Sequence, residues 1–178
     1  MHPAKQIPQM DGCTAKEVSQ VLKEAAALHK SYWNDEKLLS YSWLTYGVSE
    51  ERKEFVANLL PAVYPEWKNR YQGRISEDIF KMGDALIANY DKYSEVREGP
   101  MTLVQGDLRL DNILFTDENN RAILLDWQTA AVGLPLNDVA YCISTSFLDP
   151  SDRASAEEEL VKEYHALLEV NDSYSFEQ

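Results

Sequence analysis

A polar block set between short apolar runs, over residues 101–128, constrains this sequence more than any other feature. Residues 101–104 are apolar and strand-like, and the polar stretch 105–112 follows them directly. Residues 113–115 and 122–125 form two further apolar runs, separated by a turn-forming stretch rich in Asp and Asn. Apolar runs of this length around such a turn are typical of a hairpin. The sequence therefore predicts a β-hairpin with a polar tip, directly after a polar loop.

Helical periodicity predicts that most of the remaining chain is helical. Thr14 and Glu17 fit a capping box, in which the two side chains satisfy free N–H groups at a helix start. The expected helices begin near residues 14, 50, 76, 135 and 150, with a further one beginning near residue 174. Pro61 and Pro65 leave the end of the second helix open. The predicted fold class is α+β, mostly helical, with a small hairpin.

Size and charge limit the classes of function. The 178 residues suit one domain or one lobe of a larger protein. Lys and Arg number 17 against 30 Asp and Glu, so the formal net charge is -13. Nucleic acid and anionic membranes both favour a basic surface, so neither is an expected partner. The sequence also lacks an apolar run of the roughly 18 residues that a membrane span needs, and its first twelve residues lack the apolar core of a signal peptide.

The two cysteines bear on the compartment. Cys13 and Cys142 are far apart in the sequence and form no CxxC pair. We therefore expect neither a disulfide framework nor a zinc site, and a reducing cytoplasm is the expected location.

The polar block carries oxygen ligands at a spacing that suits phosphoryl transfer. Asp107 is followed five residues later by Asn112, and Asp126 follows the second strand of the expected hairpin. Transfer of a phosphoryl group from Mg-ATP to a hydroxyl needs one carboxylate that orients the hydroxyl proton. It also needs an amide oxygen and a second carboxylate to hold magnesium, which prefers hard oxygen ligands. A loop between strand ends allows these three groups to converge.

The amino-acid sequence of this block resembles the motifs of the aminoglycoside phosphotransferase and choline kinase-like family. Within that family it is most similar to the ecdysteroid kinase-like branch. The resemblance rests on Gly-Asp-Leu-Arg-Leu-Asp-Asn-Ile-Leu-Phe at residues 106–115 and Leu-Asp-Trp-Gln-Thr-Ala at residues 125–130. The segments around Leu28-His29 and Tyr164-His165 are similar to that branch too, so the resemblance covers about residues 13–176. It implies the C-terminal lobe of a protein-kinase-like fold and the transfer of the γ-phosphate of Mg-ATP to a hydroxyl of a small molecule.

The resemblance also implies roles for single residues. Asp107 corresponds to the catalytic base, and Asn112 and Asp126 correspond to the magnesium ligands that bind the cofactor Mg-ATP. Arg109, two residues after the base, is expected to contact the transferred phosphate and to act with Asp107 in catalysis. A surface ion pair between Arg109 and Asp111 is the alternative.

Three further residues are expected to support the loop or the core. Asp138 corresponds to an acidic residue that supports the catalytic loop in the family. Gln105 stands two residues before the base, where the family usually has a His that packs and hydrogen-bonds near the metal-binding Asp. Because Gln can hydrogen-bond but cannot stack or titrate in the same way, this change affects the precision of the loop more than the chemistry. His29 lies on the apolar side of the first helix, where we expect a structural role.

The ATP-binding lobe of such a fold is not recognisable in this sequence. The seven glycines are never closer than seven residues apart, so a GxGxxG loop is excluded. A Lys after a strand-like run is also missing from the first hundred residues, which read as helix. We therefore expect residues 1–178 to form a single kinase-like C-terminal lobe, without an N-terminal lobe and with its final helices truncated. Such a chain is expected to bind Mg-ATP poorly on its own.

Two other functions stay open on the sequence. One is a non-catalytic binding or scaffold module with the shape of a kinase lobe, which Gln105 and the missing lobe favour. The other is a metal-dependent hydrolase that uses Asp107, Asp111 and Asp126. The expected partner of the leading function is a small molecule with a hydroxyl group, and the negative charge suits a cationic one. The acceptor's identity and the oligomeric state do not follow from the sequence.

Overall fold

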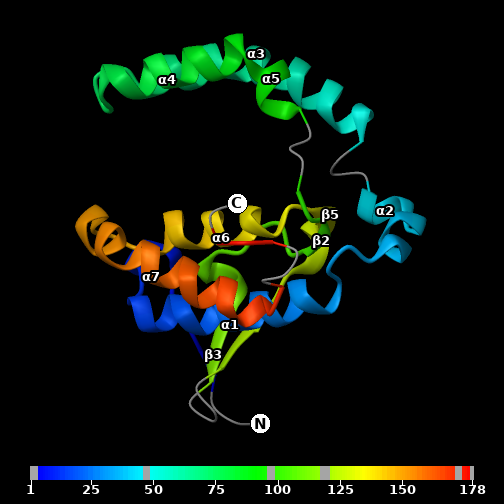
Figure 1. The fold of residues 1–178 in the computed structure, drawn as a ribbon. Coiled ribbons are helices and arrows are strands. Elements are labelled where there is room, and N and C mark those ends of the chain that lie inside the picture. The colour runs from blue at the N-terminus through cyan, green and yellow to red at the C-terminus, as the bar shows by residue number, and fades with distance from the viewer. Residues whose placement is uncertain (1–3, 46–48, 96–98, 117–120, 171–173, 177–178) are drawn as a thin grey trace. The chain divides into compact units, whose positions relative to one another are not determined.

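The computed structural model describes residues 4–45, 49–95, 99–116, 121–170 and 174–176, which fall into two compact units (Figure 1). Met1–Leu44 and Pro100–Gln178 form one unit, here called the core unit, which contains the polar block. Thr45–Gly99 form the other, here called the helical unit. Within the described residues the fold is mostly helical with two small antiparallel sheets, so the predicted α+β class is confirmed.

The first long helix of the core unit begins at the capping box that the sequence predicts. Helix α1 (Ala15–Ser31) follows Thr14, whose side chain accepts a hydrogen bond from the Glu17 N–H. The Glu17 carboxylate in turn accepts from the Thr14 N–H at 2.9 Å. Residues three and four apart share one side of a helix, which explains why the buried positions of α1 form a single stripe. The stripe consists of Val18, Val21, Leu22, Ala25, Ala26 and His29, and Gln20 is buried beside it.

Two later helices pack on α1. Helix α6 (Pro135–Ser146) and helix α7 (Pro150–Leu168) each have a proline at the first position, where a missing N–H has no cost. The Asp149 carboxylate caps α7 by accepting from the Ser151 N–H at 2.8 Å. Helix α7 runs along α1, and α6 contacts both helices (Figure 1). The three helices therefore form one layer against which the strands can pack.

The predicted hairpin is confirmed. Strands β3 (Ile113–Thr116) and β4 (Arg121–Leu124) are antiparallel, with Phe115 opposite Ala122. Both of these side chains are buried in the core with α1. The expected polar tip, residues 117–120, lies outside the described residues.

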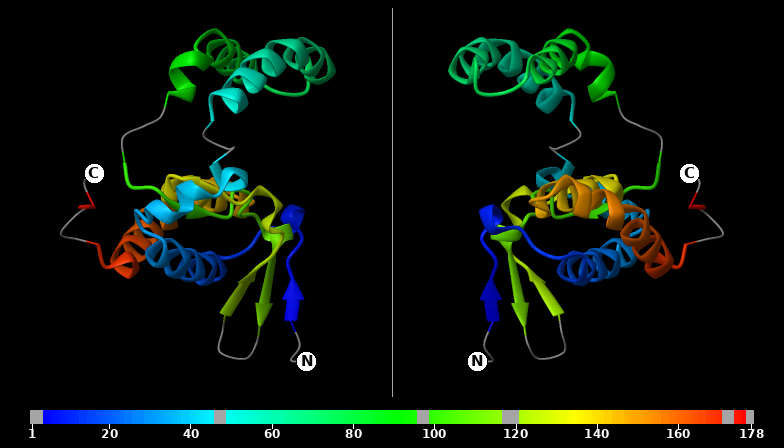
Figure 2. Two further views of the ribbon diagram at one scale, coloured as in Figure 1. Left: turned by 90° about the vertical axis from the view of Figure 1, so that its right-hand side faces the viewer. Right: turned by 90° about the vertical axis from the view of Figure 1, so that its left-hand side faces the viewer.

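Two strands were not expected from the sequence. Strand β1 (Ala4–Gln6) pairs with β3, which gives the sheet order β1-β3-β4 (Figure 2). Strand β2 (Thr102–Val104), which was expected, pairs with the unexpected strand β5 (Ala131–Gly133). Both unexpected strands have only three residues, and all three in β1 are exposed, so β1 has no apolar pattern and β5 is too short for one to be distinctive. Both segments are strands because they pair with strands that are distant in the sequence.

Short turns complete the core unit. They are the 3-10 turns Gln9–Asp11, Glu36–Ser40, Leu110–Asn112 and Trp127–Thr129, and the short helix α2 (Ser42–Thr45). The helix expected from residue 174 is not formed in the described residues Tyr174–Phe176, which adopt a bend and a turn. Among the described residues, no helix is both long enough and apolar enough to cross a membrane.

The helical unit contains α3 (Glu50–Tyr71), α4 (Glu77–Ala88) and α5 (Tyr90–Ser94). Helix α3 continues through Pro61 and Pro65, although proline disfavours a helix interior because it removes an N–H donor. Contacts between α3 and α4 hold the unit together. The Tyr64 hydroxyl donates to the Phe80 carbonyl at 2.9 Å, and the Trp67 ring stacks on Tyr64 and meets Phe80 edge-on.

Both cysteines are free thiols that contact Ser146 at the end of α6. The Cys13 N–H donates to the Ser146 carbonyl at 2.8 Å, and the Cys142 Sγ lies 3.8 Å from the Ser146 hydroxyl. Burial raises the pKa of each thiol from 9.0 to about 12, because the apolar surroundings disfavour the thiolate. The folded state therefore favours the protonated thiols. Their contribution to the free energy of unfolding is complete below pH 9 and is lost as the pH rises toward 12.

The thiols of the folded protein are therefore expected to react slowly with iodoacetamide at pH 8. The thiolate is the reactive form, and a pKa of about 12 instead of 9.0 leaves roughly one thousandth as much of it. Alkylation rates of the folded protein and of the protein in urea, followed by mass spectrometry, give the ratio. A native rate within about tenfold of the unfolded rate at either cysteine would contradict the expectation.

Candidate functional site

The loop between β2 and β3 is anchored by alternate side chains. Leu108 and Leu110 are fully buried in the core. The side chains between and beside them, Asp107, Arg109 and Asp111, are 26%, 36% and 40% exposed. The buried apolar residues fix the loop to the core, while the polar residues between and beside them reach the surface. The alternation in the sequence therefore places the predicted chemical groups on one side.

Two residues with positive φ shape the loop and the turn next to it. Gly106 has φ +85°, and a Cβ at this position would lie 2.4 Å from the carbonyl oxygen of Thr129. Only glycine allows this close approach of the loop to the turn Trp127–Thr129. Asp126, which opens that turn, has φ +53° in the left-handed region, which Asp tolerates better than most residues.

The fully buried Gln105 side chain joins the loop to the strand end that carries Asp126. Its Nε2 donates to the carbonyl of Leu125 at 2.9 Å and to the carbonyl of Asp126 at 2.7 Å. Its Oε1 accepts from the Asp107 N–H at 2.7 Å. The residue that replaces the family's usual His thus uses all its hydrogen-bonding groups, and its bonds connect the backbones of the expected base and an expected metal ligand.

Asn112 contacts the expected base directly. Its Nδ2 donates to the Asp107 carbonyl at 3.0 Å and to Asp107 Oδ2 at 2.8 Å. The Asn112 carbonyl accepts from the Leu125 N–H at 2.8 Å, which holds it beside the strand end before Asp126. Both side-chain bonds use the amide nitrogen, so the amide oxygen is the atom that can serve a cation. Hydrogen bonds therefore join Asp107 and Asn112 directly, and Gln105 joins the backbones of Asp107 and Asp126.

The expected alternative role of Arg109 is present in the structure. Its Nη1 donates to Asp111 Oδ2 at 2.7 Å, and its Nε donates to Asp107 Oδ2 at 3.2 Å. The hydrogen bond to Asp107 and the charge of that carboxylate raise the pKa of the guanidinium. Because Asn112 also uses Oδ2 of Asp107, Oδ1 is the oxygen that neither donor occupies. The contact of Arg109 with a phosphate stays a prediction.

Asp111 is bound to the N-terminal segment. Its Oδ1 accepts from the Gln9 N–H at 2.9 Å, while its Oδ2 accepts from Arg109. The Gln9 side chain accepts from the Leu110 N–H at 2.8 Å. Since both carboxylate oxygens of Asp111 have protein donors, the geometry disfavours the hydrolase that would use Asp111 as a metal ligand. Gln9 was not expected at the site, and nothing in its local sequence distinguishes it.

The expected support from Asp138 is present. This residue of α6 is buried, and its Oδ2 and Oδ1 accept from the N–H groups of Gln105 and Gly106 at 2.7 and 2.9 Å. Tyr141 follows one turn later on α6 and was not expected at the site. Burial, the charge of Asp107 and a hydrogen bond to it raise the pKa of the Tyr141 hydroxyl. Its spacing of three residues from Asp138 is the signal that places it on the same side of the helix.

The oxygen donors fit a magnesium ion. Asn112 supplies an amide oxygen, and the exposed Asp126 carboxylate accepts only a long bond of 3.3 Å from Gln128 among the contacts of the described residues. No group of three or more His, Cys, Asp or Glu side chains that could hold a metal occurs within the described part of the chain. Magnesium commonly binds through one or two protein carboxylates, with water and substrate phosphates completing its shell. A pair of protein ligands therefore suits this ion.

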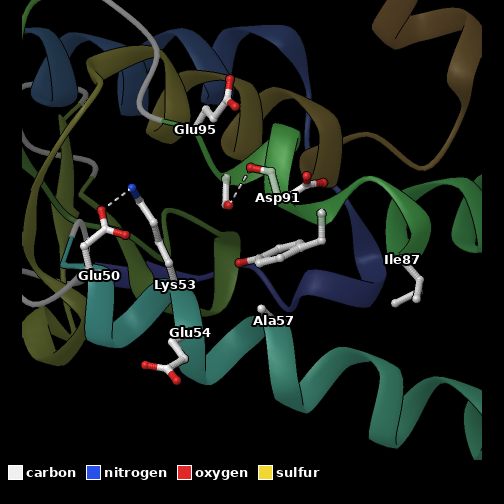
Figure 3. A pocket seen from close by; sticks show the side chains of 9 residues that line it. Glu50, Lys53, Glu54, Ala57, Ile87, Asp91 and Glu95 are labelled. Atoms are coloured by element: carbon white, nitrogen blue, oxygen red, sulfur yellow. Dashed lines mark hydrogen bonds and ion pairs between the residues drawn. The ribbon is translucent and has the colours of Figure 1, made fainter.

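The helical unit contains a cavity of about 570 Å³ between α3, α4 and α5 (Figure 3). Four carboxylates line it, against one ammonium: Glu50, Glu54, Asp91, Glu95 and Lys53. Figure 3 shows Lys53 paired with Glu50, a bond of 2.6 Å. An excess of carboxylates repels a triphosphate, so this cavity is a poor site for ATP phosphates. The loop of the core unit is therefore the better candidate site for phosphate chemistry.

Comparison with known proteins agrees with the resemblance in the sequence. The model of the ecdysteroid kinase-like family matches residues 5–172, nearly the whole chain. This chain belongs to the ecdysteroid kinase-like family. The matched range includes every predicted site residue, and the family assignment makes the chain a member of a kinase-like group. The family predicted from the sequence is confirmed.

Curated relatives of this family member match shorter stretches. Acyl-CoA dehydrogenase family member 11 of Pongo abelii is 34% identical over 79 residues, which cover 42% of this chain and 10% of that protein. The protein of the same name from Gallus gallus is 33% identical over 84 residues, covering 46% and 10%. Acyl-CoA dehydrogenase family member 10 of Mus musculus is 41% identical over 56 residues, covering 31% and 5%. The chain thus spans about a tenth or less of the length of these relatives, and we take no activity from their names.

Proposed function

We propose that this chain carries the catalytic base and the magnesium ligands of a phosphotransferase that moves the γ-phosphate of Mg-ATP to a hydroxyl of a small molecule. The proposed setting is the C-terminal lobe of a protein-kinase-like fold. The observation that carries the proposal is the connection of Asp107, Asn112 and Asp126 through the Gln105 side chain and the Asn112 amide. The family match supports the same proposal, because its matched range includes all three residues.

Each residue has a distinct task in this proposal. Asp107 accepts the proton of the acceptor hydroxyl. Asn112 and Asp126 hold magnesium, which when bound neutralises charge on the phosphates. Arg109 offers a guanidinium next to Asp107, where a transferred phosphate would need a positive charge. Positioning and charge neutralisation supply most of the catalysis.

For the substrate we propose only a chemical class. A formal charge of -13 favours a cationic acceptor, such as an amino-alcohol, over an anionic one. The sequence of this chain contains no glycine-rich phosphate loop, so we propose weak binding of Mg-ATP to the chain alone. Two free cysteines are consistent with the proposed location in a reducing cytoplasm.

Metal binding tests the proposal without requiring turnover. In an NMR titration with Mn²⁺ and ATP, we expect the amide signals of Asn112 and Asp126 to broaden first. The variant Asp126→Asn should bind Mn²⁺ at least about tenfold more weakly, since it removes a charged oxygen ligand. Asp111→Asn is the matched control: it changes a carboxylate of the same loop that Gln9 and Arg109 occupy, and should leave the affinity within about twofold.

Turnover gives the second test. ATP consumption with a panel of alcohols should be low and should fall by at least about a hundredfold in Asp107→Asn, which keeps the shape of the base but not its charge. Turnover that survives in Asp107→Asn, or equal Mn²⁺ affinity in Asp126→Asn and Asp111→Asn, would refute the proposal. The second result would leave the scaffold module as the better reading. Phosphate release from simple esters without ATP would favour the hydrolase instead.

A further inference from the structure

His29 is the most completely enclosed ionisable side chain near the loop. It lies on α1 with an exposed fraction of 0%, and both ring nitrogens meet polar groups from other elements. Nδ1 lies 2.7 Å from the Tyr164 hydroxyl on α7, and Nε2 lies 3.3 Å from Asp138 Oδ2 on α6. The roles proposed for the loop residues make no use of His29, although it is joined to the residue that supports the loop.

The two contacts of the ring assign its tautomer. Burial and the charge of Asp138 raise the pKa of Tyr164, so its hydroxyl keeps its proton and can donate to Nδ1. Asp138 already accepts a backbone N–H on each oxygen, which makes it an acceptor toward the ring as well. We infer that Nε2 carries a proton and donates it to Asp138, and Nδ1 faces the Tyr164 hydroxyl.

Asp138 links His29 to the loop that carries Asp107. The same oxygen, Oδ2, that faces His29 accepts from the Gln105 N–H, and the other oxygen accepts from the Gly106 N–H. These two peptides directly precede Asp107. The carboxylate is thus held by three donors, of which His29 is the only one outside the loop among the described contacts. Loss of the ring donor leaves Oδ2 with the Gln105 N–H alone, so the carboxylate is held by two donors from the loop and by none from the helices among the described contacts.

His29 is also fixed from the side of β2. The Thr102 hydroxyl donates to the His29 carbonyl at 2.8 Å, and the ring meets the edge of Tyr164 at 5.8 Å between centroids. Helices α1, α6 and α7 and strand β2 thus all contribute contacts to this one residue. These contacts fix the orientation of the ring, so Nε2 stays directed at Asp138.

We propose that His29 is a positioning residue: its Nε2–H fixes Asp138, and Asp138 fixes the backbone of the loop that carries Asp107. In its link to catalysis this inference rests on the proposed function, but the positioning itself can be tested with no nucleotide present. It goes beyond the structural role expected from the sequence, because a packing residue and a positioning residue respond differently to matched substitutions.

The test compares His29→Gln with His29→Asn. The Gln amide reaches the place of Nε2 and can donate to Asp138, whereas the shorter Asn amide reaches only the place of Nδ1 beside Tyr164. Both variants lose the ring and its packing. In ¹H–¹⁵N NMR spectra the amide protons of Gln105 and Gly106 should lie far downfield in the wild type, because both donate to a carboxylate. Asp138→Asn gives the reference for loss of that charge.

We expect His29→Asn to move both amide protons upfield by at least half the shift that Asp138→Asn causes, and His29→Gln to restore most of the wild-type position. Equal shifts in the Asn and Gln variants, or no shift in His29→Asn, would overturn the proposal. Should either His29 variant not fold, the wild-type protein still decides the question. Long-range ¹H–¹⁵N spectra should show a proton on Nε2, and a proton on Nδ1 alone would overturn the proposal.

These outcomes are separate from those of the metal titration. A loop that responds to His29 as expected while Mn²⁺ does not select Asp126 would leave the positioning role intact and refute the phosphotransferase. The opposite pair of results would leave the phosphotransferase intact and refute the role of His29.

Discussion

The variant Asp138→Ala is expected to lower the free energy of unfolding of the core unit by about 3–5 kcal/mol. The substitution removes the shared acceptor of three donors: the N–H groups of Gln105 and Gly106 and Nε2 of His29. Each buried donor left without a partner costs about 1–3 kcal/mol. Urea unfolding followed by tryptophan fluorescence measures the loss.

The matched control for this variant is Asn137→Ala. Asn137 is the preceding residue of α6 and is exposed, so its replacement should change the free energy by no more than about 0.5 kcal/mol. Asp138→Asn should fall between the two, since it keeps one acceptor oxygen but turns an amide toward a donor. A loss below about 1.5 kcal/mol in Asp138→Ala would mean that water replaces the carboxylate, and that the loop does not depend on it.

Gly106→Ala is expected to cost about 2–4 kcal/mol and to displace the loop. The positive φ of +85° is one source of strain, and the second is the Cβ that would lie 2.4 Å from the Thr129 carbonyl oxygen. A backbone oxygen cannot rotate away as a side chain can, so either the loop or the turn Trp127–Thr129 has to move. Affinity for Mn²⁺ with ATP should fall together with stability, because Asp107 and Asp126 flank the two moving segments.

Gly12→Ala separates the two sources of strain. Gly12 also has a positive φ, +65°, but its Cβ would meet mainly the side chain of Leu148, which is 67% exposed and can move. We expect a cost of about 1 kcal/mol there and an unchanged metal affinity. Equal effects of the two alanine variants on stability and on metal affinity would show that the close approach at Gly106 is unimportant.

The parts of the site that the sequence predicted are those specified locally. The spacing from Asp107 to Asn112 and the strand before Asp126 are read directly from neighbouring residues, and the hairpin then brings their ends together. The capping box at Thr14 and the family assignment are of the same kind. Short-range patterns of polar and apolar residues determine these features, so they need no knowledge of packing.

The parts that were missed depend on residues distant in the sequence. Gln9 contacts Asp111 across about a hundred residues, and His29 contacts Tyr164 and Asp138 across similar separations. No local pattern reports such pairs. The end of α3, which the sequence left open at Pro61 and Pro65, also depends on packing, because a local proline rule does not include the contacts of Tyr64 and Trp67 with α4.

The N-terminal segment connects to the loop without passing through the helices. The Gln6 side chain donates to the Asp111 carbonyl, and Gln9 binds Leu110 and Asp111, while β1 runs beside β3. The N-terminal segment therefore holds the charged side of the loop independently of the helical layer. Asp111 joins this segment to Arg109, and Arg109 in turn contacts Asp107. The charge beside Asp107 is therefore positioned by residues that lie next to two paired strands of the sheet, β1 and β3.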